Sequence, residues 1–149
     1  SLSYLAALAG ERKVYGFDAW HHALPESPFD RREAGTMEFS VAIGLIQAKL
    51  KRWGVDPSRC VLVRGLIAET APQTETGPVA YLHVDVDLYQ SYLDSLTAFW
   101  PRMSTGAVAV FDEYHETEVW PGAKRAVDEF LGSRPHELHE DLRWWARKL

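Results

Sequence analysis

Acidic residues stand directly after two apolar stretches of this sequence. The stretch Val79–Val84, "VAYLHV", is followed by Asp85 and, two residues later, by Asp87. The stretch "AVAVF" is followed by Asp112 and Glu113. Carboxylates that lie close together repel one another, and each disfavours ionisation of the others, so a bound cation would relieve the conflict. Because oxygen ligands favour hard ions, we expect Mg²⁺ or Mn²⁺ rather than zinc.

These acids can meet only if the strands that deliver them are parallel neighbours. Strand-like and helix-like patterns alternate along the chain, which favours an α/β fold: a Rossmann-like, mainly parallel sheet with helices on both faces. In such sheets ligands bind beyond the carboxyl ends of the strands. Asp18 follows "VYGF" and Gly65 follows "VLVR", so both are expected at that edge. An acid after the second strand of a nucleotide-binding sheet typically accepts hydrogen bonds from ribose hydroxyls.

Each candidate residue also has a structural explanation. Asp87 precedes a helical pattern, so a helix cap explains it as well as a functional role does. Capping explains Asp112 and Glu113 less well, because no clear helix follows them directly. His83 fits a core histidine with satisfied hydrogen bonds, and His115 fits either a solvated loop residue or a base near the acids.

The elements that would position these residues follow from the apolar spacing. Helices are expected at Leu2–Ala9, Met37–Trp53, Tyr89–Trp100 and Ala123–Leu131. Strands are expected at "KVYGF", "CVLVRG", "VAYLHV" and "AVAVF", with both faces of "VAYLHV" covered. The segments "HHALPESPFDRREAGT", which holds His21 and His22, and "LIAETAPQTETGP" are expected to be mostly loop, and "MSTG" a turn. The tail "HELHEDLRWWARKL" is expected to form two short strands at an antiparallel edge of the sheet.

Composition excludes several classes of protein. A chain of 149 residues suits one domain with one core. The net charge of −5 and the lack of a basic stripe argue against a nucleic-acid partner. Cys60 is the single cysteine, so no internal disulfide can form, and its strand-like setting favours an inert buried thiol. Without a recognisable signal peptide or membrane span, a cytoplasmic protein with no membrane partner is expected.

The second half of the chain resembles a known family. The stretch "HVDVDLYQSYLDSLTAFWPRMSTGAVAVFDEYHETEVWPGAKRAVDEF" resembles the TylF-type (macrocin and mycinamicin) O-methyltransferases. That family shows a Leu-Asp-x-Asp-x-Tyr-x-Ser stretch, a Leu-Ser-x-Gly-Gly turn, a strand ending Asp-Asp-Tyr and a Pro-Gly-x-x-x-Ala-Val-x-x-Phe helix. "VYGFDAWHHALPE" and "CVLVRGLIAETAP" are similar to two further family segments, in the right order.

The resemblance implies a methyl transfer from S-adenosylmethionine to a hydroxyl of a sugar or other natural-product small molecule, assisted by Mg²⁺ or Mn²⁺. By position, the metal ligands are Asp85, Asp112 and Glu113, and the catalytic residues are Asp87, as proton acceptor, and Asp85. The implied cofactor-binding residues are Asp18 at the ribose, Ala19 beside it, Gly65 and Leu66 along the adenine, and Asp85. A homo-oligomer is left open.

The chain departs from the family at several positions. Glu113 stands in place of an aspartate, which makes that side of the metal shell one methylene longer. Ala107 replaces a second glycine, and His21 and His22 replace acidic and glycine residues. The match begins after the family's first strand and glycine-rich loop, so we expect one N-terminally incomplete domain. The gap would be filled by an upstream segment, by a strand of a partner, or by pairing of "VYGF" with "YLHV".

Two other functions fit parts of the pattern. An inactive relative could serve as a binding or assembly module, and a strand with a glycine-rich turn upstream of Ser1 would argue for the enzyme instead. "DVDLY" also resembles the Asp-x-Asp motif of haloacid-dehalogenase phosphatases. That motif usually has threonine or valine where Tyr89 stands, and it normally ends the first strand of its domain.

Overall fold

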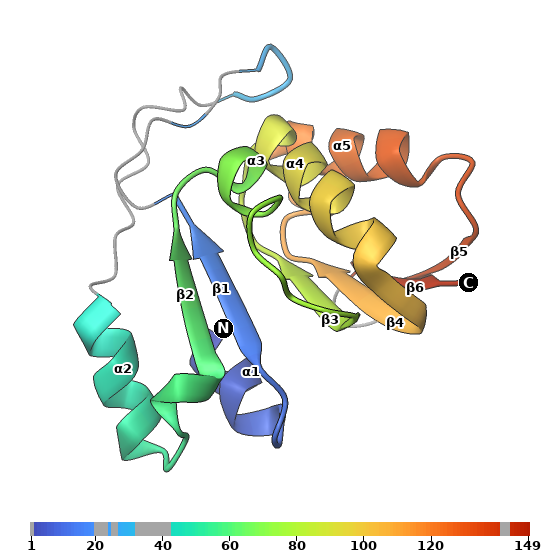
Figure 1. The fold of residues 1–149 in the computed structure, drawn as a ribbon. Coiled ribbons are helices and arrows are strands. Elements are labelled where there is room, and N and C mark those ends of the chain that lie inside the picture. Colours follow the sequence, from blue (N-terminus) through green and yellow to red (C-terminus); the bar gives the residue numbers. More distant parts are fainter. Residues whose placement is uncertain (1, 20–23, 25–26, 32–42, 141–143) are drawn as a thin grey trace. The chain divides into compact units, whose positions relative to one another are not determined.

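The computed structural model describes residues 2–19, 24, 27–31, 43–140 and 144–149 (Figure 1). The chain divides into two compact units. The first unit comprises Ser1–His22 and Met37–Leu66, and the second comprises Ala23–Thr36 and Ile67–Leu149. The expectation of one N-terminally incomplete domain remains a prediction.

The first unit is a small helix–strand assembly. Its elements are α1 (Leu2–Leu8), β1 (Val14–Asp18), α2 (Ile43–Arg52), the 3₁₀ helix η2 (Pro57–Arg59) and β2 (Cys60–Arg64). β1 and β2 are parallel, with Val14 opposite Cys60 and Asp18 opposite Arg64. The buried core of this unit is small, with Ala6, Leu50 and Val55 at its centre. Both predicted strands and the first helix are confirmed, while the predicted helix at Met37–Trp53 is described only from Ile43, because residues 32–42 lie outside the described part.

The second unit holds a four-stranded sheet and the helices that cover it. Its elements are α3 (Ile67–Thr70), β3 (Val79–Val84), α4 (Tyr89–Phe99), the 3₁₀ helix η3 (Trp100–Arg102), β4 (Met103–Phe111), α5 (Pro121–Leu131), β5 (His136–Glu140) and β6 (Trp144–Lys148). The strand order is β3-β4-β6-β5, with β3 and β4 parallel and the other neighbours antiparallel. This confirms the predicted antiparallel C-terminal edge. α4 and α5 lie side by side against the sheet (Figure 1).

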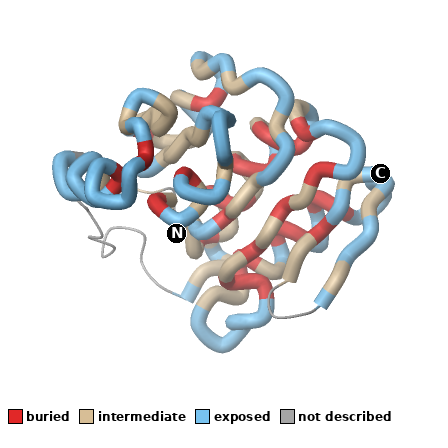
Figure 2. The backbone as a smooth tube through the Cα atoms, turned by 90° about the horizontal axis from the view of Figure 1, so that it is seen from below, coloured by how far each residue is buried: buried red, intermediate tan, exposed pale blue. Residues whose placement is uncertain are grey.

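The core of the second unit fixes the ends of its two parallel strands. Val84 is the last residue of β3 and Phe111 the last of β4, and both are fully buried. They belong to one apolar cluster with Tyr92 and Leu96 of α4 and Val127 of α5. Figure 2 shows the buried stretches in red along the chain, with exposed stretches in pale blue between them. Because Val84 and Phe111 are packed in this core, they hold the backbone at the point where the residues after each strand begin.

The segment "LIAETAPQTETGP" is mostly loop, as predicted, with the short helix α3 inside it. Arg102 donates to the carbonyls of Ala71 and Thr74 just after this helix and ties the region to η3. Two other predictions for this unit are wrong in detail. β4 begins at Met103, so "MSTG" is strand rather than turn. Val79 pairs with Met103 and Tyr81 pairs with Val108, so the register shifts between these two pairs. The β4 residues around Gly106 (φ 80°) form a bulge there, and the strand continues through it back to Met103.

The second error concerns β3, which is not covered on both faces. Ala80 is exposed, and Tyr81 is 44% exposed. Among the described residues, β3 pairs only with β4 and β1 pairs only with β2. The alternative in which "VYGF" pairs with "YLHV" stays a prediction.

Candidate metal centre

The structure brings the three predicted metal ligands together. Asp85, Asp112 and Glu113 each offer a carboxylate oxygen, and these atoms lie within 4.8 Å of one another. The parallel register continues past the strand ends, because the Asp112 amide donates to the Val84 carbonyl oxygen at 3.0 Å. The residues after β3 and β4 are thus held at one edge of the sheet, as the sequence pattern requires.

The electrostatics of this cluster favour a cation. Glu113 is 4% exposed, and burial raises its pKa to about 8, with the charges of Asp87, Asp85 and Asp112 acting in the same direction. A hydrogen bond from Tyr92 opposes that shift. The pKa of Asp85 is instead lowered, mainly by His83, whose Nε2 lies 3.7 Å from Asp85 Oδ2. Glu113 therefore tends to keep its proton in the absence of a cation. A positive charge bound among these acids would stabilise the ionised form of Glu113.

The donor set fits Mg²⁺ or Mn²⁺. All three groups are carboxylates, and neither histidine nor cysteine is part of the cluster. Hard divalent cations take oxygen ligands and keep several water molecules, which leaves coordination positions for a hydroxyl of a second molecule. The residues present therefore suit a metal that binds and orients an oxygen-containing substrate.

Asp87 occupies an unusual backbone conformation beside the cluster. Its φ is +61°, a left-handed value that is uncommon for residues other than glycine and is several-fold enriched in Asp and Asn. Such strain is often found at functional sites. The N-cap position of α4 is Leu88, so the reading of Asp87 as the N-cap residue is wrong. Its charge contributes to the raised pKa of Glu113, so the two carboxylates are electrostatic neighbours.

The start of α4 is held by residues far away in the sequence. The Tyr89 amide donates to both carboxylate oxygens of Asp30, at 3.0 and 3.3 Å. Phe29 packs edge-on against the Tyr89 ring, and the Arg125 guanidinium lies 3.6 Å from the centroid of Phe29. At Gly122 any Cβ would overlap the Asp30 carboxylate, so only glycine leaves room for this contact. Sequence reasoning missed Asp30, because its partner lies 59 residues away and no local pattern marks it.

Asp30→Ala should lower the free energy of unfolding of the second unit by about 1 kcal/mol, the usual effect of losing a side chain that caps a helix. Chemical denaturation followed by circular dichroism measures this change. Glu118→Ala, which removes an exposed acid elsewhere in the second unit, is the control and should have an effect near zero. Equal stability of both variants would show that Asp30 does not cap α4 in solution.

Four of the five residues predicted to bind the cofactor lie in the first unit, and the fifth, Asp85, belongs to the acidic cluster of the second unit. Asp18 ends β1, and Gly65 follows β2 directly. The Gly65 amide donates to the Asp18 carbonyl oxygen at 3.0 Å, which holds the two chain segments side by side, with Ala19 and Leu66 next along them. Gly65 has a φ of 131°, which explains why glycine stands there. Asp18 is exposed at this edge.

Among the described residues, the histidines and the single cysteine do not join the acidic cluster as ligands. His83 is not the satisfied core histidine expected, because its buried Nδ1 has no hydrogen-bond partner in the described part of the protein. His115 is exposed, and His21 and His22 lie outside the described residues. Burial raises the pKa of the Cys60 thiol, which agrees with an unreactive cysteine.

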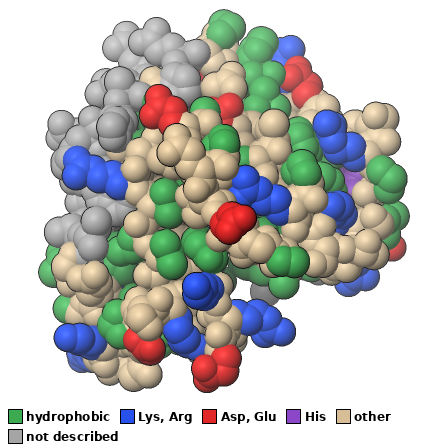
Figure 3. Space-filling view, viewed as in Figure 1, with side chains coloured by type: hydrophobic (Ala, Val, Ile, Leu, Met, Phe, Trp, Pro, Cys, Tyr) green, Lys and Arg blue, Asp and Glu red, His purple; other side chains and the backbone are tan. Residues whose placement is uncertain are grey.

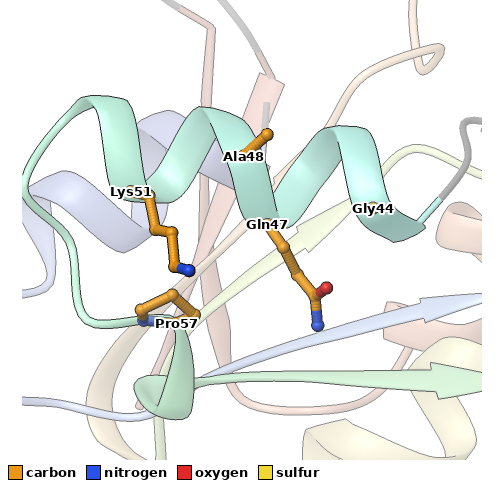
Figure 4. A pocket seen from close by; sticks show the side chains of 5 residues that line it. All are labelled: Gly44, Gln47, Ala48, Lys51 and Pro57. Carbon is orange, nitrogen blue, oxygen red and sulfur yellow. The ribbon is translucent and has the colours of Figure 1, made fainter.

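A depression outside the acidic cluster is a second feature of the described surface. A shallow depression lies between α2 and η2, lined by Gly44, Gln47, Ala48, Lys51 and Pro57 (Figure 4). It contains no carboxylate, so it cannot replace the acidic cluster as a metal site. On the face in Figure 3, acidic and basic side chains are interspersed. No described helix is both long enough and apolar enough to cross a bilayer.

Comparison with known proteins gives a consistent family of matches. Residues 3–146 match the family model described as Macrocin-O-methyltransferase (TylF). The 8-demethyl-8-(2,3-dimethoxy-alpha-L-rhamnosyl)-tetracenomycin-C 4'-O-methyltransferase of Streptomyces olivaceus is 31% identical over 75 residues, which are 50% of this chain and 29% of that protein.

Two solved structures share the fold. The calicheamicin methyltransferase CalS11 matches with a TM-score of 0.75 and 27% identity, covering 98% of this chain and 66% of its own. The O-methyltransferase NovP matches with a TM-score of 0.76 and 23% identity, covering 93% of this chain and 60% of its own. The chain thus spans less than two thirds of the length of these relatives.

Proposed function

Because the chain belongs to the TylF family of macrocin O-methyltransferases, we propose that it carries the metal centre of an enzyme that methylates a hydroxyl of a sugar or related natural product. The methyl donor in this proposal is S-adenosylmethionine. The observation that carries the proposal is the convergence of the Asp85, Asp112 and Glu113 carboxylates where β3 and β4 end. The name of the Streptomyces olivaceus relative, which specifies a rhamnosyl group, supports a sugar as the acceptor.

Each acid has a defined task in this proposal. Asp85, Asp112 and Glu113 hold Mg²⁺ or Mn²⁺, which when bound lowers the pKa of a coordinated hydroxyl and fixes its orientation. Asp87, beside the cluster, accepts the proton that the hydroxyl loses as its oxygen bonds to the methyl carbon and the carbon–sulfur bond breaks. S-adenosylhomocysteine is then the leaving product. The protein forms no covalent bond, so its main contribution is positioning.

Binding of the methyl donor is assigned to the first unit. Asp18 accepts hydrogen bonds from the ribose hydroxyls, with Ala19 beside it, and Gly65 and Leu66 lie along the adenine. Support for this assignment is the pairing that places these residues at the carboxyl ends of β1 and β2, where parallel sheets bind nucleotides.

The proposed function is tested by calorimetric titration of S-adenosylmethionine and S-adenosylhomocysteine, each with and without Mg²⁺. We expect both ligands to bind, and Mg²⁺ to bind in a separate titration. If neither the nucleotides nor Mg²⁺ bind at millimolar concentrations, the chain is an inactive binding module rather than a methyltransferase.

Asp18→Asn should weaken S-adenosylmethionine binding by about 1–3 kcal/mol, because hydrogen bonds from the ribose to a charged acceptor are lost. This corresponds to a dissociation constant raised by about 5- to 150-fold. Calorimetry measures it, with Glu11→Gln as the control, since Glu11 is an exposed acid before β1. Unchanged affinity in Asp18→Asn would remove Asp18 from the site.

Mg²⁺ affinity should rise with pH up to about pH 8, because Glu113 must lose its proton to act as a ligand. In the metal-free protein the raised pKa of Glu113 stabilises the fold most below about pH 4.5. That contribution is lost as the pH rises through about 8. Titrations at pH 7 in two buffers with different ionisation enthalpies should detect the release of close to one proton per Mg²⁺. Proton release near zero would contradict the assignment of Glu113.

A further inference from the structure

Tyr92 places a hydroxyl group inside the core of the second unit, directly behind the acidic cluster. Its side chain is 0% exposed and belongs to the apolar face of α4. Burying a hydroxyl without a hydrogen bond is costly, so a tyrosine that only filled space here would be a worse choice than phenylalanine. The hydroxyl must therefore have a partner, and the structure identifies it.

The Tyr92 hydroxyl is hydrogen-bonded to the ends of both parallel strands. It donates to Glu113 Oε2 at 2.6 Å, and it accepts from the Glu113 amide at 3.3 Å. The carbonyl oxygen of Val84, the residue before Asp85, lies 3.2 Å from the same hydroxyl. The hydroxyl has one hydrogen, and we assign it to the bond with Glu113. This distance is shorter than the one to the Val84 carbonyl oxygen, and a carboxylate is a stronger acceptor than a carbonyl. Burial raises the pKa of the Tyr92 phenol, so the hydroxyl keeps this hydrogen.

Glu113 needs such a contact more than its neighbours do. A glutamate has one more rotatable bond than an aspartate, so holding its carboxylate in one place costs additional side-chain entropy. Asp85 and Asp112 have shorter side chains that follow directly from strands. In metal sites, ligating carboxylates are usually oriented by hydrogen bonds from outside the ligand set.

We propose that Tyr92 is a positioning residue for the divalent cation: its hydroxyl holds the Glu113 carboxylate in the orientation in which Glu113, Asp85 and Asp112 bind the metal together. This inference rests on the proposed function, since it presumes that the cluster binds a cation. Tyr92 itself does not contact the metal or the substrates. It compensates for the length of Glu113, so its effect should depend on which residue stands at position 113.

A double-mutant cycle tests this dependence. Mn²⁺ affinity is measured by calorimetry for the wild-type chain, Tyr92→Phe, Glu113→Asp and the double variant, with thermal unfolding of each metal-free protein recorded alongside. We expect Tyr92→Phe to weaken Mn²⁺ binding about tenfold in the wild-type background, as is typical for residues that orient metal ligands. In the Glu113→Asp background it should change the affinity by less than about twofold, because the shorter carboxylate does not reach the phenol.

Tyr114→Phe is the matched control. Tyr114 is also buried, but its hydroxyl donates to Asp128 Oδ1 and accepts from Lys124. Neither of these two partners belongs to the acidic cluster. Its loss should leave Mn²⁺ affinity unchanged. An equal effect of Tyr92→Phe in both backgrounds, or none in the wild type, would overturn the inference. Should Glu113→Asp bind no cation, the comparison of Tyr92→Phe with Tyr114→Phe decides, and equal affinities would overturn it. Absence of Mn²⁺ binding in the wild-type chain would instead overturn the proposed function.

Discussion

Replacing Asp112 by alanine should weaken Mn²⁺ binding at least about 100-fold, equivalent to about 2.7 kcal/mol. The substitution removes one of three carboxylates that converge within 4.8 Å, and no neutral side chain can replace its charge. The fold should survive, because the Asp112 amide still donates to Val84 and the side chain is only half-buried. Calorimetry measures the affinity, and thermal unfolding of the metal-free variant measures the stability.

Glu116→Ala is the control for that experiment, since Glu116 is an exposed acid in the same segment after β4. It should bind Mn²⁺ like the wild type, which separates a ligand role from a general effect of negative charge. If Asp112→Ala binds Mn²⁺ normally, Asp112 is not a ligand. If the variant does not fold, Asp112 has a structural role that the geometry does not suggest.

Residues 1–149 expressed alone should not unfold in one cooperative transition. The first unit should open first, because its two-stranded sheet is marginal by itself and its core centres on three buried residues. The second unit has a far larger core, from Val84 to Ala146.

Hydrogen exchange followed by mass spectrometry measures this difference directly. Amides of β1 and β2 should lose protection at lower denaturant than those of β4, by several kcal/mol of opening free energy. Thermal unfolding with and without S-adenosylmethionine is the second measurement. A single sharp transition in a monomer that binds S-adenosylmethionine at micromolar concentrations would contradict the prediction that the chain is an incomplete domain.

Much of the second unit could be predicted because its signals are local. "VAYLHV" is an apolar run bounded by Pro78 and Asp85, and β3 has these bounds. The acids after β3 and β4 could be placed together from the sequence, because parallel neighbours end at the same edge. The bulge that extends β4 back to Met103 could not be predicted, because it depends on how Val79 pairs.

The residues that support the site were harder to find. Tyr92 lies within the helix predicted at Tyr89–Trp100, and a buried tyrosine signals that its hydroxyl needs a partner. That partner, Glu113, becomes apparent only when α4 is packed on the sheet. Asp30 gives no signal at all, because it lies inside the segment predicted to be loop and caps a helix that begins much later in the chain. The roles of Tyr92 and Asp30 depend on contacts between segments far apart in the sequence, which no local pattern indicates.

The most direct test of a metal centre at this sheet edge is a crystal structure of the chain soaked with Mn²⁺, with data collected at the manganese absorption edge. An anomalous peak should lie about 2.0–2.6 Å from carboxylate oxygens of Asp85, Asp112 and Glu113. No peak at this position under saturating Mn²⁺, or a peak held by other residues, would contradict the assignment of these three acids as the metal site.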